Sequence, residues 1–150
     1  MSFLSDLAVG KQAETELVST LSTEFPTFTD FAYNTSSKLA ELKKYDISFT
    51  APSGQYTIEV KNDLRSSQTG NFAFEILYKG KPSGINSTEA TFFAVKSGES
   101  FYIFQTNELR KLLLETPHNW RQTDIINGTA TVILVPIEDI KDMATVVPVQ

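Results

Sequence analysis

A long proline-free segment near the start of the chain, followed by short runs that alternate apolar and polar residues, constrains the fold most. Residues 5–24 contain no proline and one glycine, and they place Leu7, Leu17 and Leu21 at helical spacing. The Phe-Pro step at 25–26 should end this helix, because the residue before a proline disfavours helical geometry. The chain therefore begins with one amphipathic helix that needs an apolar surface to cover.

Most of the remaining chain has the composition of β-strands separated by turns. Residues rich in Val, Ile, Thr, Phe and Tyr predict strands at 46–50, 55–61, 71–78, 91–95, 100–104 and 130–135. We expect shorter helices in three places. Weak helical spacing indicates one at 36–44, Thr106 can cap a second that runs to about Glu115, and a third is expected at 138–143. We expect an α/β fold, with a mixed central β-sheet flanked by helices, and a single domain over residues 1–150.

The composition excludes several classes of site. The chain has no cysteine and one histidine, so a disulfide framework, a thiolate-rich zinc site and a multi-histidine site are all ruled out. Any bound metal must use oxygen ligands. The net charge of -5 argues against a protein that simply coats nucleic acid, although seven of the thirteen basic residues lie between Lys38 and Lys81. No apolar run spans a membrane and no secretory signal is evident, so we expect a cytoplasmic location.

The segment Glu59-Val60-Lys61 carries the first candidate chemistry. Side chains alternate along a strand, so Glu59 and Lys61 share one face and Val60 points to the other. A turn centred on Ser53-Gly54 would place Asp46 opposite Lys61 and Ser48 opposite Glu59. Two carboxylates that converge on one face repel each other unless a cation or proton intervenes, and hard divalent cations prefer oxygen ligands. The alternative is a cross-strand ion pair on a solvated face.

Glu14 favours the metal site over the ion pair. It lies seven residues from both Leu7 and Leu21, in the middle of the apolar stripe of the first helix. A carboxylate there is costly to bury unless it is paired or bound to a metal. The alternative is an acid at the edge of the stripe that reaches solvent.

These residues resemble the PD-(D/E)XK nuclease superfamily, the fold of many restriction enzymes and of archaeal-type Holliday junction resolvases. The resemblance starts with Gly10-x-x-x-Glu14, Tyr45-Asp46-Ile47 and Ile58-Glu59-Val60-Lys61, with Tyr45 in place of a frequent proline. It continues through three later segments and spans roughly residues 10–110, and these segments are similar to a small, often phage-borne branch. They are Thr69-Gly70-Asn71-Phe72-x-Phe74-Glu75, Ser83-Gly84-Ile85 and Thr88-Glu89-Ala90.

The resemblance implies a magnesium- or manganese-dependent deoxyribonuclease with a restriction-endonuclease-like core. Asp46, Glu59 and the Val60 carbonyl would bind the metal, and Lys61 would be the catalytic lysine. Glu14 would be a further ligand or would orient the attacking water. Asn71 and Glu75 would line the rim of the cleft, and Arg65 is also expected to contact the DNA substrate. Lys79 and Lys81, beside Ser83, could hold a phosphate with the help of backbone N–H groups, and the alternative is a solvated turn.

We therefore expect an endonuclease, structure-selective or resolvase-like, that acts on DNA and forms a homodimer. The alternative is a catalytically inactive nuclease-fold protein, a DNA- or protein-binding accessory factor of phage origin, which the acidic composition favours. His118 is a lone histidine after a helix and is expected in a loop or packing role. The aromatic residues of the strands are expected in the core.

Overall fold

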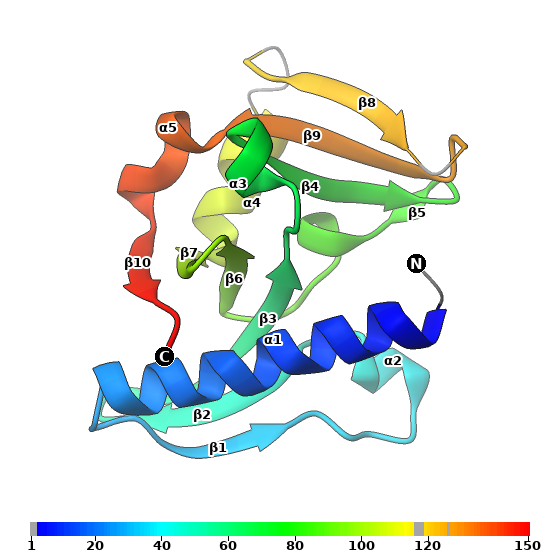
Figure 1. Ribbon diagram of the computed structural model, residues 1–150. Coiled ribbons are helices and arrows are strands. Elements are labelled where there is room, and N and C mark those ends of the chain that lie inside the picture. Colours follow the sequence, from blue (N-terminus) through cyan, green and yellow to red (C-terminus); the bar gives the residue numbers. More distant parts are fainter. Residues whose placement is uncertain (1–2, 116–118, 126) are drawn as a thin grey trace.

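Two β-sheets and one long helix make up most of the protein (Figure 1). The computed structural model describes residues 3–115, 119–125 and 127–150. Helix α1, Phe3–Glu24, lies across one face of a six-stranded sheet. A four-stranded sheet packs against the opposite face. None of the described helices is long and apolar enough to cross a membrane.

The six-stranded sheet is mixed. Its order is β1-β2-β3-β6-β7-β10, and β3 pairs with β6 in parallel while the other neighbours pair antiparallel. Strand β3 therefore lies in the interior of the sheet. The bounds are β1 Thr29–Tyr33, β2 Ile47–Ala51, β3 Gly54–Asn62, β6 Phe92–Ser97, β7 Ser100–Gln105 and β10 Thr145–Pro148.

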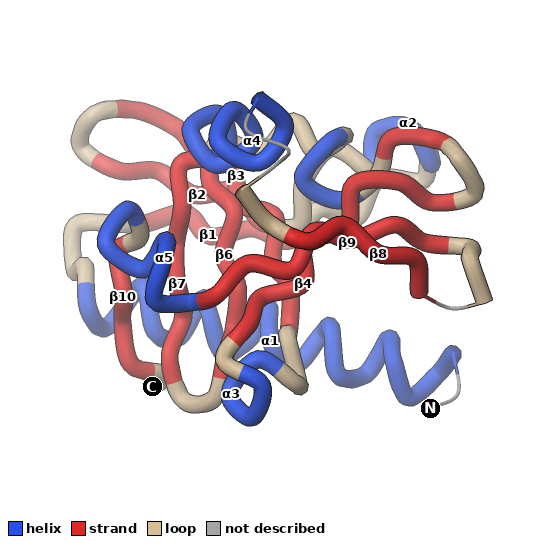
Figure 2. Tube along the Cα trace, turned by 90° about the horizontal axis from the view of Figure 1, so that it is seen from above, coloured by secondary structure: helices blue, strands red, loops and turns tan. Residues whose placement is uncertain are grey.

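The four-stranded sheet is antiparallel throughout, in the order β5-β4-β9-β8. Figure 2 shows β4 and β9 running beside the end of β3, with α3 at the connection from β3 to β4. This sheet therefore forms a second wall next to the candidate residues of β3. Its strands are β4 Asn71–Tyr78, β5 Lys81–Pro82, β8 Arg121–Ile125 and β9 Ala130–Pro136.

Short helices connect the strands. Helix α4 is the longest of them and buries Leu109 and Leu113 against the sheets. The bounds are α2 Leu39–Leu42, α3 Ser66–Thr69, α4 Thr106–Glu115 and α5 Ile137–Ile140, with 3-10 turns η1 Gly84–Asn86 and η2 Lys141–Met143.

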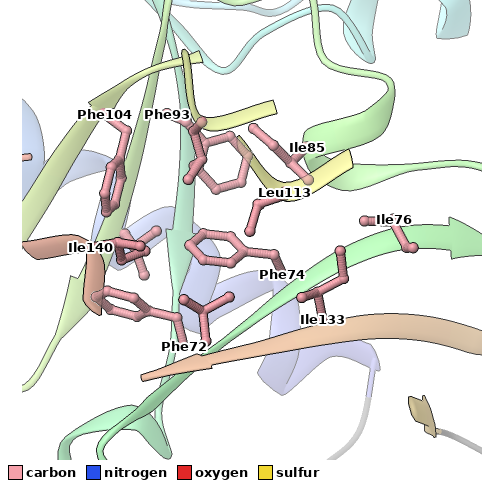
Figure 3. Close-up of a cluster of buried hydrophobic side chains, with 12 residues drawn as sticks. Phe72, Phe74, Ile76, Ile85, Phe93, Phe104, Leu113, Ile133 and Ile140 are labelled. Carbon is pink, nitrogen blue, oxygen red and sulfur yellow. The ribbon is translucent and has the colours of Figure 1, made fainter. Parts of the chain in front are cut away.

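Two apolar clusters stabilise this arrangement. One joins Leu17 and Leu21 of α1 to the face of the six-stranded sheet that carries Ile58 and Val60. The other fills the space between the sheets, where Phe72 and Phe74 of β4 meet Phe93 and Phe104 (Figure 3). Each fully buried side chain of this kind contributes about 1.5–3 kcal/mol. The aromatic residues of the strands are in the core, as expected.

The structure agrees with the expected α/β class and mixed central sheet, and the helices at 3–24 and 106–115 lie where they were predicted. Four strands were missed: β1, β5, β8 and β10. Most residues of β1 and β8 are exposed, so neither strand has an alternating apolar pattern. The capping role given to Thr106 is wrong, because its buried hydroxyl has no hydrogen-bond partner among the described residues. His118 lies outside the described residues.

Candidate active site

The β2–β3 hairpin brings Asp46, Glu59 and Lys61 to one face of the six-stranded sheet. Its register pairs Ile47 with Ile58 and Ser48 with Thr57. The expected pairs, Asp46 with Lys61 and Ser48 with Glu59, are therefore wrong, because the turn falls one residue earlier than expected. The error is two residues in register, and a shift of two preserves the face to which each side chain points.

Asp46 lies just before β2 and extends the pairing of the two strands. Its N–H donates to the Ile58 carbonyl at 2.9 Å, and its carboxylate accepts the Val60 N–H at 2.7 Å. The carboxylate thus replaces the carbonyl that a longer β2 would offer. The N–H and C=O of one strand residue point to the same edge, so the Val60 carbonyl also points to this side. Burial raises the pKa of Asp46, while the Val60 hydrogen bond and Lys61 act to lower it.

Glu59 is the most perturbed carboxyl group of the site. Its side chain is 13% exposed, and it lies 3.5 Å from the Lys61 ammonium group. Burial raises the pKa of Glu59 to about 7; Lys61 opposes this shift, and the negative charge of Asp46 adds to it. Lys61 itself has a side chain that is 49% exposed, so its ammonium group faces solvent as well as Glu59.

Glu14 approaches the same cluster from α1. Its side chain is 12% exposed and lies 3.6 Å from the Lys11 ammonium group. Burial is the main cause that raises the pKa of Glu14, and the next is the negative charge of Asp46. Glu14 is therefore within electrostatic range of Asp46 and Lys61. The convergence of Glu14 with Asp46, Glu59 and Lys61 within direct contact stays a prediction.

The loop between η1 and β6 holds Glu59 in place, a role that the sequence did not reveal. Thr88 is buried, and its hydroxyl lies 3.1 Å from the Lys44 carbonyl and 3.4 Å from the Glu59 carboxylate. Arg110 of α4 donates hydrogen bonds to the carbonyls of Ile85 and Thr88. Thr88 belongs to the Thr88-Glu89-Ala90 segment of the family resemblance, and that segment was the only signal for it.

Gly84 explains why this loop can approach β4 closely. It has a φ of +56°, and a β-carbon there would collide with the Glu75 backbone. The Ser83 N–H donates to the Ile76 carbonyl at 3.0 Å, which anchors the loop to β4. The Ser83 hydroxyl, expected to contact substrate, is instead buried with no hydrogen-bond partner in the described parts of the chain.

A cleft of ≈ 690 Å³ opens beside Lys61, between the end of β3 and the second sheet. Four of the expected substrate or catalytic residues line it: Lys61, Arg65, Asn71 and Glu75. Lys79 and Lys81 are exposed at the β4–β5 turn and are not among the residues that line this cleft.

The donor chemistry of the site fits a hard divalent cation. Asp46 and Glu59 are neighbouring carboxylates whose charges disfavour each other, and the Val60 carbonyl points to the same side. A magnesium ion keeps several waters and needs only one or two protein carboxylates. Within residues 3–115, 119–125 and 127–150, no group of three His, Asp or Glu side chains is already arranged to hold a metal. Protein ligands beyond two carboxylates would therefore require Glu14 or Val60.

Comparison of the chain with protein-family models, curated proteins and solved structures gives no significant match.

Proposed function

We propose that the protein is a metal-dependent phosphodiesterase that cleaves DNA internally. One observation carries the proposal: two half-buried carboxyl groups with raised pKa values, Asp46 and Glu59, share a sheet face with Lys61. Perturbed titratable groups at the edge of a cleft are a frequent property of catalytic sites. Glu14 supports the proposal, because it reaches the same cluster from a different element.

The order of elements supports a restriction-endonuclease-like core and membership of the PD-(D/E)XK superfamily. The helix that carries Glu14 covers one face of a mixed sheet, and the strand with Glu59 and Lys61 lies inside that sheet. The downstream segment Ser83-Gly84-Ile85 packs against the strand that contains Glu75. Each segment of the sequence resemblance therefore contributes to one region of the molecule.

The chain's residues have distinct roles in the proposed reaction. Asp46 and Glu59 would hold magnesium or manganese, with the Val60 carbonyl and Glu14 as further oxygen donors. When bound, the metal would supply Lewis acidity at the scissile phosphate and lower the pKa of water. Lys61 would donate hydrogen bonds to the phosphate and offset the negative charge that grows in the transition state. Arg65, Asn71 and Glu75 in the adjoining cleft would contact the DNA strand.

The proposal includes a homodimer, since a chain with one such site that cuts both strands of a duplex needs a second site. An endonuclease that selects branched DNA, as a resolvase does, fits within the same proposal. Cytoplasmic DNA, including that of a phage-infected host, would be the substrate.

A second candidate is a nuclease-fold protein that binds DNA or another protein without cutting. The net charge of -5 and the missing three-acid group among the described residues favour it. The close association of Asp46, Glu59 and Lys61 favours the nuclease, because a binding protein has no need for buried carboxylates beside a lysine.

A cleavage assay separates the two. Supercoiled plasmid, linear duplex, single-stranded and four-way-junction DNA are each incubated with purified protein and magnesium or manganese. We expect cleavage of at least one substrate, and its loss in Glu59→Gln and Lys61→Ala. The matched controls are Glu108→Gln and Lys111→Ala, exposed residues of α4, which should cleave normally. Cleavage that persists unchanged in both site variants would overturn the assignment.

A further inference from the structure

A second hollow lies on the opposite side of Glu59 from the cleft at Lys61. Gln55, Thr57, Glu59 and Lys61 follow one another on one face of β3. Gln55 and Thr57 line the second hollow, whereas Lys61 lines the cleft. The carboxylates of the candidate active site therefore lie between two recesses, so a bound strand of nucleic acid has room on both sides.

The hollow starts close to the carboxylates. Thr57 is two residues before Glu59, and Ser48 is two residues after Asp46. Residues two apart on a strand are separated by about 6.8 Å along its axis. Ser48 and Thr57 are also register partners across the two strands. A group bound against them would be a direct neighbour of one held at Asp46 and Glu59.

The lining of the hollow is rich in hydroxyl groups and poor in charge. Its volume is ≈ 520 Å³, within the usual range for small-ligand pockets. The one charged residue in its lining is Asp30, at the β1 side. The cleft at Lys61, by contrast, has four charged residues in its lining, the cations Lys61 and Arg65 and the acids Asp63 and Glu75. Six residues that carry a hydroxyl group are in the lining of the hollow: Tyr45, Ser48, Thr50, Tyr56, Thr57 and Thr91.

Thr57 and Thr91, which both line the hollow, are joined by two hydrogen bonds from backbone N–H groups to side-chain hydroxyls. The Thr91 N–H donates to the Thr57 hydroxyl at 3.1 Å, and the Thr57 N–H donates to the Thr91 hydroxyl at 3.5 Å. Each hydroxyl oxygen is therefore held as an acceptor of a backbone N–H. A hydroxyl also has one proton to donate, and among the described residues neither Thr57 nor Thr91 donates it to a protein acceptor.

We infer that this hydroxyl-lined hollow binds the nucleoside next to the scissile phosphate, through the sugar and the edge of the base. Phosphates are bound chiefly by lysine and arginine, and the lining contains neither. Neutral sugar and base groups match neutral donors and acceptors, and Asp30 imposes no penalty on them. The inference rests on the proposed function, because the phosphate would occupy the adjoining carboxylate–lysine site.

The test is a nuclear magnetic resonance titration of isotope-labelled protein with magnesium present. The two probes are thymidine 3′,5′-bisphosphate and inorganic phosphate. We expect both probes to shift the amide signals of Glu59 and Lys61, and the thymidine compound alone to shift those of Ser48, Thr57 and Thr91. The combined change Ser48→Ala and Thr57→Val should weaken binding of the thymidine compound about tenfold and leave phosphate binding unchanged.

Two further variants separate hydrogen bonding from loss of structure. Thr57→Ser keeps the hydroxyl and should retain affinity, and Thr145→Val, on the exposed surface of β10, should bind as the unmodified protein does. If both probes shift the amide signals of Glu59 and Lys61 but the signals of the residues that line the hollow do not change, the nucleoside site is overturned and the proposed function stands. If neither probe shifts Glu59 or Lys61, the phosphate site of the proposed function is overturned, and the nucleoside site with it.

Discussion

The two faces of strand β3 meet opposite physical demands. On one face Ile58 and Val60 are 1% and 8% exposed and pack beneath α1. On the other face Glu59 lies beside Lys61, and burial raises the pKa of Glu59 to about 7. The apolar face stabilises the fold, whereas the fold disfavours the ionised carboxylates of the other face. Titratable groups with perturbed pKa values, gathered in one place, are a frequent property of functional sites.

The largest expected effect is on the charged face. Lys61→Ala should lower the rate of DNA cleavage by about 10³-fold or more, because hydrogen bonds to developing charge are lost. The free energy of unfolding should change by less than about 1 kcal/mol, since the Lys61 side chain is half exposed. Initial cleavage rates and urea denaturation measure the two quantities. If Lys61→Ala were inactive because it is unfolded, Lys61 would be needed for folding, and the two faces of β3 would not have separate roles.

Ile58→Ala tests the apolar face. The side chain is 1% exposed, so its truncation should lower the free energy of unfolding by about 2–5 kcal/mol. Residual cleavage per folded molecule should stay close to that of the unmodified protein, because Ile58 points away from the carboxylates. A loss of stability below about 1 kcal/mol would show that α1 does not pack tightly on this face.

Glu59→Gln should stabilise the metal-free protein at neutral and higher pH. The folded-state pKa of about 7 lies above the ordinary value of 4.5, so the folded state holds a proton that the unfolded chain has released. Unmodified protein is thus most stable below pH 4.5 with respect to this group, and loses up to about 3 kcal/mol as pH rises through 7. The glutamine of Glu59→Gln does not ionise, so this variant should not lose stability in that way as pH rises. Thermal unfolding in chelator at several pH values measures it, and an unchanged pH slope in Glu59→Gln would contradict the cause.

The smallest expected effect concerns Thr88, which acts through Glu59 as a positioning residue. Thr88→Val should lower the affinity for the metal by about tenfold, and Thr88→Ser should restore it. The pKa of Glu59 should rise further in the valine variant, because a hydrogen bond that lowers this pKa is lost. Calorimetric titration and the pH profile of cleavage test both points. Equal behaviour of the valine and serine variants would assign Thr88 to packing alone.

The sequence predicted the faces of β3 well and the details of pairing poorly. Alternation in 55–61 correctly separates Glu59 and Lys61 from Val60, because side-chain direction depends only on being in a strand. The register of the hairpin depends on the position of its turn. The turn is centred on Pro52-Ser53, and predicting it one residue later shifts every expected pair by two residues. The predicted face of Asp46 was correct only because a register shift of an even number of residues preserves the direction of each side chain. The burial of Glu14 could be predicted, because a carboxylate within an apolar helical stripe is conspicuous.

The remaining features depend on tertiary structure that local patterns do not contain. Strand β1 is exposed and irregular, with Asp30 at a φ of +56° and a shifted register against β2. Thr88 lies 29 residues from Glu59 along the chain, and contacts with Arg110, Lys44 and β4 hold its loop in place. The cleft at Lys61 is formed where segments from distant parts of the chain meet, so no local sequence pattern marks it.

The most direct test of the central claim is calorimetric titration with magnesium or manganese near pH 7, in buffers with different ionisation enthalpies. Binding to Asp46 and Glu59 should release protons, since Glu59 is about half protonated there and a metal-bound carboxylate is not. We predict saturable binding with proton release that is abolished by Asp46→Asn and by Glu59→Gln. Binding that survives in both variants without proton release, or no binding at all, would contradict the assignment of this face to a metal.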